Sequence, residues 1–172
     1  LIGLGYNFIS ETDTEVLPHL FMKYIKLGND FLEAGRLVLK DIKGAFAFVA
    51  MSVDFPDQLF VSRNSSPLAI GLGDKANFIG SDAHSIDHLT QRIIYLEDGD
   101  HALVKINNIN IFDKSFKKVK RKIINIQAEI GLITKGGYKH FMEKEIFEQP
   151  VVLPKTTSSF IKNNSEIMID LN

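Results

Sequence analysis

The most constraining feature of this sequence is a series of short apolar segments, separated by turn residues, between Gln58 and Ile124. Segments of this length are typical of β-strands. The intervening turns contain Gly, Asp, Asn or Pro, which accept tight or left-handed backbone geometry. Because such turns are too short for parallel crossovers, the pattern predicts antiparallel sheets. The predicted strands are Gln58–Arg63, Leu68–Leu72, Asn77–Ser81, Arg92–Leu96, His101–Ile106, Ile109–Phe112 and Phe116–Ile124.

Two helices are predicted before this series. Apolar residues recur at helical spacing from about Asp13 to Leu27, and Thr12 with Glu15 has the spacing of a capping box, in which each side chain satisfies a backbone amide at the helix start. A second helix is predicted over Asp30–Ile42, because its apolar residues keep to one face.

Two further strands are predicted outside the main series. Tyr6–Ser10 is a short strand candidate directly before the first helix. Ala45–Met51 is continuously apolar, which is typical of a strand covered on both faces. Helical layers around a sheet would supply that cover, so the fold class is predicted to be α+β.

The end of the chain is predicted to be simpler. A helix is expected over Tyr138–Glu148 and is predicted to end at Pro150, because proline lacks the amide that continues a helix. Residues 151–172 combine Pro, Ser, Thr and Asn and are predicted to form a linker or a frayed end. The length of 172 residues and the 45% apolar content indicate one domain over residues 1–150.

Composition excludes several function classes. The formal net charge of -1 gives no general attraction to nucleic acid or to an anionic membrane, and no apolar run is long enough to span a bilayer. Cysteine is absent, so these residues provide no disulfide, no thiolate metal ligand and no thiol nucleophile. A cytoplasmic location is the default expectation, and no cofactor is predicted.

Other possible sites have simpler explanations. His84 and His88 have the i, i+4 spacing of metal ligands, but no Glu of the metalloprotease pattern lies between them, and no metal site is predicted. The serines near Asp82 and His84 lack the Gly-x-Ser-x-Gly nucleophile turn, so we interpret them as turn and strand-end residues. The basic run Lys114–Lys122 is interrupted by apolar residues and is interpreted as a solvated hairpin.

Four stretches together resemble the glutaminase domain of the glutamine–fructose-6-phosphate aminotransferase family. They agree with that family in order and spacing, and the resemblance covers about Gly5 to Pro150. The stretches are Ser10-Glu11-Thr12-Asp13-Thr14-Glu15, Ser66-Pro67-Leu68 with Ile70-Gly71-Leu72-Gly73, Tyr95-Leu96-Glu97-Asp98-Gly99-Asp100, and Tyr138-Lys139-His140-Phe141-Met142-Glu143-Lys144-Glu145-Ile146-Phe147-Glu148-Gln149-Pro150.

The resemblance implies an N-terminal-nucleophile hydrolase fold, an αββα sandwich of antiparallel sheets, here incomplete at its N-terminus. In such class II glutamine amidotransferases a terminal Cys attacks the glutamine amide, and an Asn-Gly pair holds the oxyanion. We expect those residues upstream of Leu1 and the sugar isomerase domain downstream of residue 172. The chain alone is therefore expected to be inactive.

The resemblance assigns one binding residue to this chain. Asp13 corresponds to the residue that binds the α-ammonium group of glutamine, and an anion at a helix N-terminus is physically reasonable there. From the residues alone, Asp13 would be interpreted as a helix cap. Expected partners are glutamine, the isomerase domain of the same enzyme, and further copies of the enzyme if it forms a homo-oligomer.

The expected function is that of a glutaminase fragment of an enzyme that makes glucosamine 6-phosphate from fructose 6-phosphate. The alternative is a non-catalytic glutamine-binding or regulatory module with the same fold. A Cys at the start of an extended reading frame would distinguish the enzyme from the module.

Overall fold

The computed structural model describes residues 1–126, 137–158, 161–162 and 166–167, and the chain forms two compact units. The first unit spans residues 1–126 and the second spans residues 127–172. All the strands predicted from Gln58 onward lie in the first unit, together with the first two helices.

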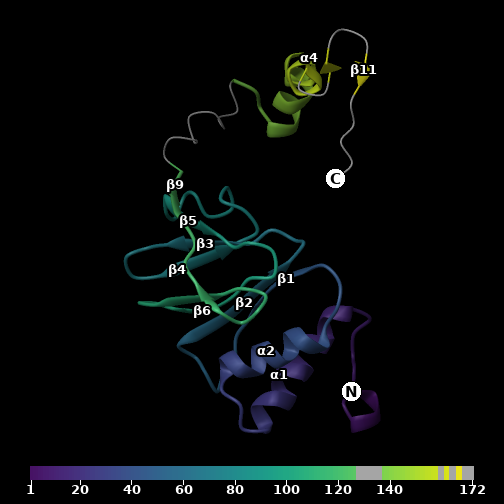
Figure 1. Ribbon diagram of the computed structural model, residues 1–172, viewed down its shortest axis with the longest axis vertical. Coiled ribbons are helices and arrows are strands. Elements are labelled where there is room, and N and C mark those ends of the chain that lie inside the picture. Colours follow the sequence, from purple (N-terminus) through teal and green to yellow (C-terminus); the bar gives the residue numbers. More distant parts are fainter. Residues whose placement is uncertain (127–136, 159–160, 163–165, 168–172) are drawn as a thin grey trace. The chain divides into compact units, whose positions relative to one another are not determined.

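Two antiparallel sheets make up most of the first unit (Figure 1). One sheet has the strand order β1-β2-β6-β7-β8, and the other has the order β4-β3-β5-β9. Every neighbouring pair is antiparallel, so this part of the prediction is confirmed. The strands are β1 Phe46–Ala50, β2 Gln58–Asn64, β3 Ala69–Leu72, β4 Asn77–Gly80, β5 Arg92–Tyr95, β6 His101–Lys105, β7 Ile109–Phe112, β8 Lys118–Val119 and β9 Ile123–Asn125.

An apolar core contributed by strands of both sheets lies between them. Alternate residues of each strand point into it, as the pleat requires. Because burying one aliphatic side chain typically contributes about 1.5–3 kcal/mol, this layer is a main source of stability. Its buried members are Val61, Leu68, Ile70, Ile94, Leu96, Ala102, Val104 and Ile111.

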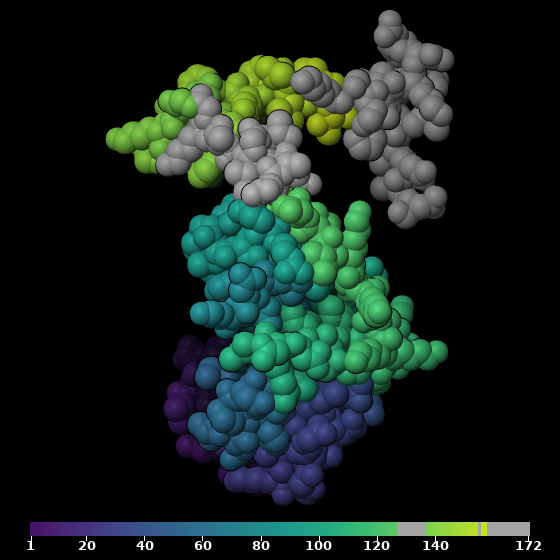
Figure 2. Space-filling model, turned by 90° about the vertical axis from the view of Figure 1, so that its left-hand side faces the viewer, coloured from purple at the N-terminus to yellow at the C-terminus, as the bar shows by residue number. Residues whose placement is uncertain are grey.

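Helices cover the other face of the five-stranded sheet (Figure 1). They are the 3-10 turn η2, Asp13–Glu15, which continues directly into α1, Val16–Lys26, and then α2, Phe31–Asp41. In Figure 2 these blue and purple segments lie against the teal strands. The Asp30 side chain caps α2 by accepting from the Glu33 amide at 2.8 Å. The predicted sandwich with a helical layer is thus confirmed.

The helical layer approaches its sheet closely at Gly35 of α2. A Cβ atom added there would lie 2.2 Å from Cε2 of Phe60, a fully buried ring of β2. Phe60 is the centre of an aromatic cluster that also contains Phe21 and Phe31, with ring centroids 5.6 and 6.3 Å away. Glycine is therefore required at this position by packing rather than by backbone conformation.

The outer face of the four-stranded sheet is covered by a connection of consecutive turns over residues 81–90. Ile86 in this connection is buried, and its side chain lies near Gly71 of β3. In the described part of the chain this outer layer is not an α-helix, although the sandwich fold led us to expect helices on both sides.

The structure corrects the prediction for Ala45–Met51. In β1 the exposure alternates, and Phe48 and Ala50 pack toward the helices while Val49 is 46% exposed. Met51, just after the strand, is 82% exposed. β1 is an edge strand of its sheet, and its inner face extends beyond the core between the sheets. The apolar side chain of Val49 on that face is therefore not covered by the other described residues.

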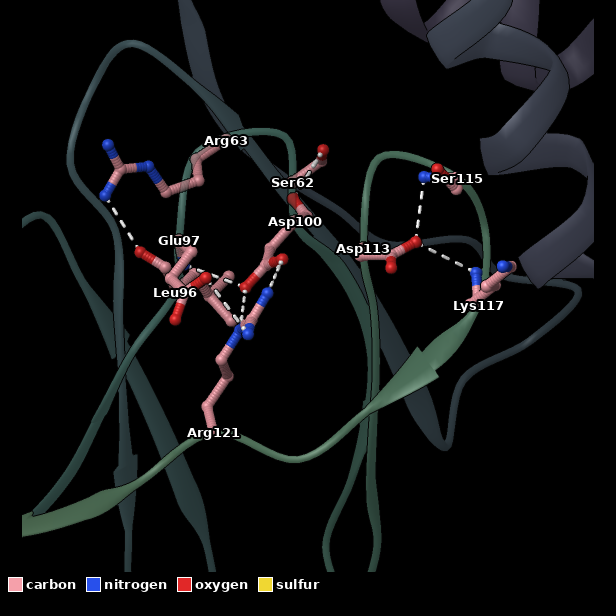
Figure 3. A network of polar contacts seen from close by, with 9 residues as sticks. All are labelled: Ser62, Arg63, Leu96, Glu97, Asp100, Asp113, Ser115, Lys117 and Arg121. Atoms are coloured by element: carbon pink, nitrogen blue, oxygen red, sulfur yellow. Dashed lines mark hydrogen bonds and ion pairs between the residues drawn. The ribbon is translucent and has the colours of Figure 1, made fainter.

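The predicted strand Phe116–Ile124 is divided between the two sheets. β8 belongs to the first sheet and β9 to the second, and residues 120–122 cross between them. Arg121 lies in this crossing, where its Nε and Nη2 atoms each donate to the Asp100 carboxylate at 2.8 Å (Figure 3). Arg121 is mostly buried and Asp100 is fully buried, so the interpretation of this run as a solvated hairpin is wrong at Arg121.

The second unit contains a helix that is longer than predicted. α4 spans Phe141–Ser158 and includes both Pro150 and Pro154, so the prediction that the helix ends at Pro150 is wrong. The Thr157 hydroxyl donates to the carbonyl oxygen of Leu153 at 2.9 Å near the end of the helix. Two short strands, β10 Ile161–Lys162 and β11 Glu166–Ile167, pair antiparallel after α4. None of the described helices has the length and apolar character needed to cross a membrane.

The close approach at Gly35 generates a first prediction. Gly35→Ala should destabilise the first unit by about 1–3 kcal/mol, because the methyl group overlaps the Phe60 ring even though Ala favours helices. The measurement is the urea denaturation midpoint. Gly3→Ala is the matched control, since an added Cβ there meets nothing within 4 Å. Equal midpoints for the two variants would contradict the prediction.

The buried ion pair generates a second prediction. Asp100→Asn should cost about 3 kcal/mol of unfolding free energy, because among the described residues it leaves the mostly buried Arg121 with only Glu97, 3.0 Å away, as an ionic partner. Asp57→Asn is the control, since the Asp57–Lys105 pair is exposed and should contribute no more than about 1 kcal/mol. The prediction fails if both variants lose similar stability in urea denaturation.

Candidate functional site

Asp13 is the first residue of η2, at the N-terminal end of the helical layer, and its side chain is exposed. The cap of this turn is Thr12, whose hydroxyl oxygen accepts from the Thr14 amide at 3.3 Å. Asp13 is therefore not the capping residue. Its carboxylate accepts one long hydrogen bond, 3.5 Å, from the Thr14 hydroxyl, and it forms no ion pair with another side chain of the described residues.

The electrostatic setting of Asp13 suits a cationic ligand. The positive end of the helix dipole stabilises a carboxylate at this position, and exposure leaves its oxygens open to a ligand. A primary ammonium group would find a fixed anion there without first breaking an ion pair.

Glu15 holds the segment before Asp13 in place. Its carboxylate accepts from the Ile9 amide at 2.9 Å, from the Ser10 amide at 2.8 Å, and from the Ser10 hydroxyl. These hydrogen bonds, the Ser10 hydroxyl first, lower the pKa of Glu15 to about 2. The carboxylate therefore stays ionised throughout the physiological range, and the turn that carries Asp13 stays connected to residues 9 and 10.

This arrangement corrects two predictions. Thr12 and Glu15 do not form the reciprocal capping box, because Glu15 bonds to residues 9 and 10 rather than to the Thr12 amide. Tyr6–Ser10 is irregular rather than a strand. Its amides at Ile9 and Ser10 donate to a side chain, and they are unavailable for a strand ladder. Sequence reasoning recognised Glu15 as a helix-start residue, but its role in holding the preceding segment was missed.

Aromatic contacts also fix this segment. The rings of Tyr6 and Phe8 lie 5.4 and 4.7 Å from the His19 ring of α1, both in edge-on geometry. His19 Nε2 in turn lies 3.6 Å from the Glu15 carboxylate. Residues 6–10 therefore lie against the first turn of α1, beside Asp13.

An apolar groove of about 530 Å³ begins next to this turn. One wall is α1 together with Thr14, and the other is formed by β1 and the residues that follow it, up to Asp54. The lining is mainly apolar and includes Phe21 and Phe48. The groove runs along the edge strand of the five-stranded sheet, and Asp13 directly precedes its lining residue Thr14 in the chain.

The other candidate residues are not brought into a common site. His84 and His88 lie in turns, and each has Nδ1 3.8–3.9 Å from the Asp87 carboxylate rather than facing a shared ligand position. No cluster of three or more metal-binding side chains occurs among the described residues. The Asp82 carboxylate accepts from the Ser85 amide at 2.9 Å, which is a turn contact rather than part of a triad.

Ser62 is likewise structural. It is buried, and its hydroxyl donates to the Asp100 carbonyl at 3.1 Å, so it is not presented to a substrate. The glycines of the Gly71-Leu72-Gly73 stretch lie in and just after β3, where they make room for neighbouring side chains and backbone. None of these residues competes with Asp13 as the candidate binding residue.

No protein-family model matches the chain. Individual relatives do match. The chain is 42% identical over 170 residues to a glutamine–fructose-6-phosphate aminotransferase of Fusobacterium nucleatum, and 42% identical over 162 residues to that of Zymomonas mobilis. It is 41% identical over 169 residues to that of Escherichia coli strain K12. These alignments cover 94–99% of this chain but only 27–28% of each relative.

A solved structure supports the same fold. The glutamine phosphoribosylpyrophosphate amidotransferase of B. subtilis superposes with a TM-score of 0.55 over 68% of this chain and 26% of its own, at 23% identity. At that identity the likeness speaks for the fold alone. Over the 27–28% of their length that it spans, the chain belongs to the glutamine–fructose-6-phosphate aminotransferase family.

Proposed function

We propose that this chain is the glutamine-binding later part of a glutaminase domain. Once completed by the rest of its protein, that domain would release ammonia from glutamine for the synthesis of glucosamine 6-phosphate from fructose 6-phosphate. The observation that carries the proposal is the similarity to a glutamine–fructose-6-phosphate aminotransferase over 99% of the chain. The chain spans only about 28% of such a relative, so the activity belongs to the whole protein.

Asp13 is proposed to bind the α-ammonium group of glutamine. Three features support this role: its exposure, its place at a helix N-terminus, and the lack of a competing cation among the described side chains. A charge-assisted hydrogen bond to an ammonium group is about twice as strong as a neutral one. Glu15 is proposed as a positioning residue that keeps the Asp13 turn fixed against residues 9 and 10.

The groove and the open face of β1 are proposed to contact the remainder of the glutaminase domain. Val49 and Met51 expose apolar surface there, and an edge strand offers unpaired backbone groups for another strand. Further strands of the same domain would cover this surface and carry the nucleophile and the oxyanion donors toward Asp13.

The remaining parts of the proposal concern the second unit and the assembly. α4 exposes apolar side chains such as Phe147 and Val151, which suits contact with the proposed sugar isomerase domain. The proposed division places the glutaminase part at residues 1–150 and the connection to the isomerase at residues 151–172. The cytoplasmic location and the homo-oligomer predicted from the resemblance belong to the same proposal.

The first functional prediction is that the 172-residue chain alone releases no ammonia from glutamine above the buffer rate. It contains no Cys, and no other residue can serve as the thiol nucleophile. The measurement is a coupled assay for ammonia on the purified chain. The complete protein with its terminal Cys should be active in the same assay. Turnover by the chain alone would contradict the prediction, and an inactive complete protein would favour the non-catalytic module.

The second functional prediction concerns Asp13→Asn in the complete protein. The variant keeps the size of the side chain but removes the charge opposite the ammonium group. Losing a hydrogen bond to a charged group costs about 1.5–3 kcal/mol, so glutamine should bind about 10- to 100-fold more weakly. Binding of fructose 6-phosphate should be unchanged, because that site belongs to another domain. The measurement is a calorimetric titration of each ligand.

Glu11→Gln provides the matched control for this variant. Glu11 is an exposed carboxylate two residues away, and its neutralisation should leave the glutamine affinity within about twofold of wild type. Equal losses for Asp13→Asn and Glu11→Gln would indicate a general electrostatic effect. An unchanged affinity in Asp13→Asn would remove Asp13 from the binding site, while a loss for both ligands would indicate misfolding.

A further inference from the structure

We propose that His101 is a pH-sensitive joint: protonation of this buried imidazole loosens the helical layer, α1 and α2, from the five-stranded sheet. This pH response changes how firmly the helical layer, which carries Asp13, is attached to the five-stranded sheet. It is independent of whether Asp13 binds glutamine.

The geometry around His101 is that of an aromatic box. The side chain of this first residue of β6 is fully buried on the helix-facing side of the sheet. Its ring stacks on Phe60 and Phe112, with centroids 5.9 and 5.3 Å away, and meets Phe116 edge-on at 5.2 Å. Neither ring nitrogen has a hydrogen-bond partner among the described residues. A neutral imidazole can occupy such a box, but an imidazolium has no acceptor there.

The same rings hold α2 against the sheet. The guanidinium carbon of Arg36 lies 4.5 Å from the Phe112 ring centre and 5.7 Å from that of Phe116. Arg36 Nη2 also donates to the Phe116 carbonyl at 3.3 Å. Phe60, under Gly35, completes the contact from the sheet side. His101 is therefore in contact with three of the rings on which α2 rests.

The charged groups that face the box act on the imidazole in both directions. From α2 come the cations Arg36 and Lys40, the latter 5.4 Å above the Phe116 ring. The anions are Asp100, next to His101 in the chain and already paired with Arg121, and Asp113, which follows β7 and accepts the amides of Ser115 and Lys117. Burial first, and then the Arg36 charge, lower the pKa of His101 from 6.5 to about 4.

The direction of the pH response follows from that shift. When the layer is open, His101 regains its ordinary pKa near 6.5 and binds a proton more readily than in the closed state. The closed state is therefore fully favoured above pH 6.5 and loses stability as the pH falls from 6.5 toward 4. At pH 5.0 compared with pH 7.5, the open fraction should rise about 10- to 30-fold.

The test is amide hydrogen exchange, read by mass spectrometry, on the complete protein that contains this chain. Exchange at pH 7.5 and 5.0 is corrected for the intrinsic rate at each pH. Peptides from Val16–Asp41 should lose about 10- to 30-fold of their protection at pH 5.0, and peptides from β3 and β5 should lose less than about threefold. Unchanged protection of the helical peptides in the wild-type protein overturns the proposal without any variant.

Two variants assign the effect to His101. His101→Phe keeps an aromatic ring and His101→Leu keeps an apolar side chain, and neither can bind a proton. In each variant that folds, the protection of the helical peptides should change by less than about threefold between pH 7.5 and 5.0. His84→Leu, which removes an imidazole that is 57% exposed, should keep the full wild-type response. A wild-type response in the His101 variants would show that other groups carry it and would overturn the proposal.

The pH range separates His101 from the carboxylates. Backbone hydrogen bonds, from Lys117 first, lower the pKa of Asp113, so it remains ionised at pH 5.0. Glu15, with a pKa of about 2, also keeps its charge there. Because the readout is backbone exchange rather than glutamine turnover, a failed glutaminase assignment would leave this test unaffected.

Discussion

The ion pair between Asp100 and Arg121 joins the two sheets, and much of the first unit depends on it. Asp100 accepts two hydrogen bonds from Arg121 and one from the Glu97 amide, while its carbonyl accepts from the Arg63 amide at 3.0 Å (Figure 3). A buried carboxylate is tolerable only when satisfied in this way. One residue thereby fixes the turn before β6, the end of β2 and the crossing from β8 to β9.

The same turn also places His101 on the helix-facing side of the five-stranded sheet. Asp100 faces the crossing, and the next residue, His101, points into the aromatic box beneath α2. The polar joint between the sheets and the apolar joint to the helices therefore occupy consecutive residues. The two joints differ in chemistry, since the first depends on a charged carboxylate and the second on an uncharged imidazole. The proposed response to pH acts through the second joint.

The strand positions could be predicted from the sequence, because turn residues and apolar segments are local signals. Which cation of the basic run enters the interior could not be predicted, because Asp100, the partner of Arg121, lies 21 residues away in the sequence. The exposed inner face of β1 was missed for a similar reason. An apolar sequence indicates that both faces of a strand are covered, but among the described residues Val49 remains 46% exposed. Glu15 was predicted to act locally, whereas it bonds five and six residues back.

The proposed role of Asp13 as a binding residue limits what this chain can do by itself. Glutamine carries an ammonium group, a carboxylate and an amide, and one carboxylate on the protein recognises only the first of these. A single charge-assisted hydrogen bond contributes about 1.5–3 kcal/mol, which is too little for affinity or selectivity. Every amino acid with a free ammonium group would satisfy Asp13 equally. Discrimination must come from donors and acceptors that meet the other two groups, and the groove beside β1 leaves space for the segments that would bring them.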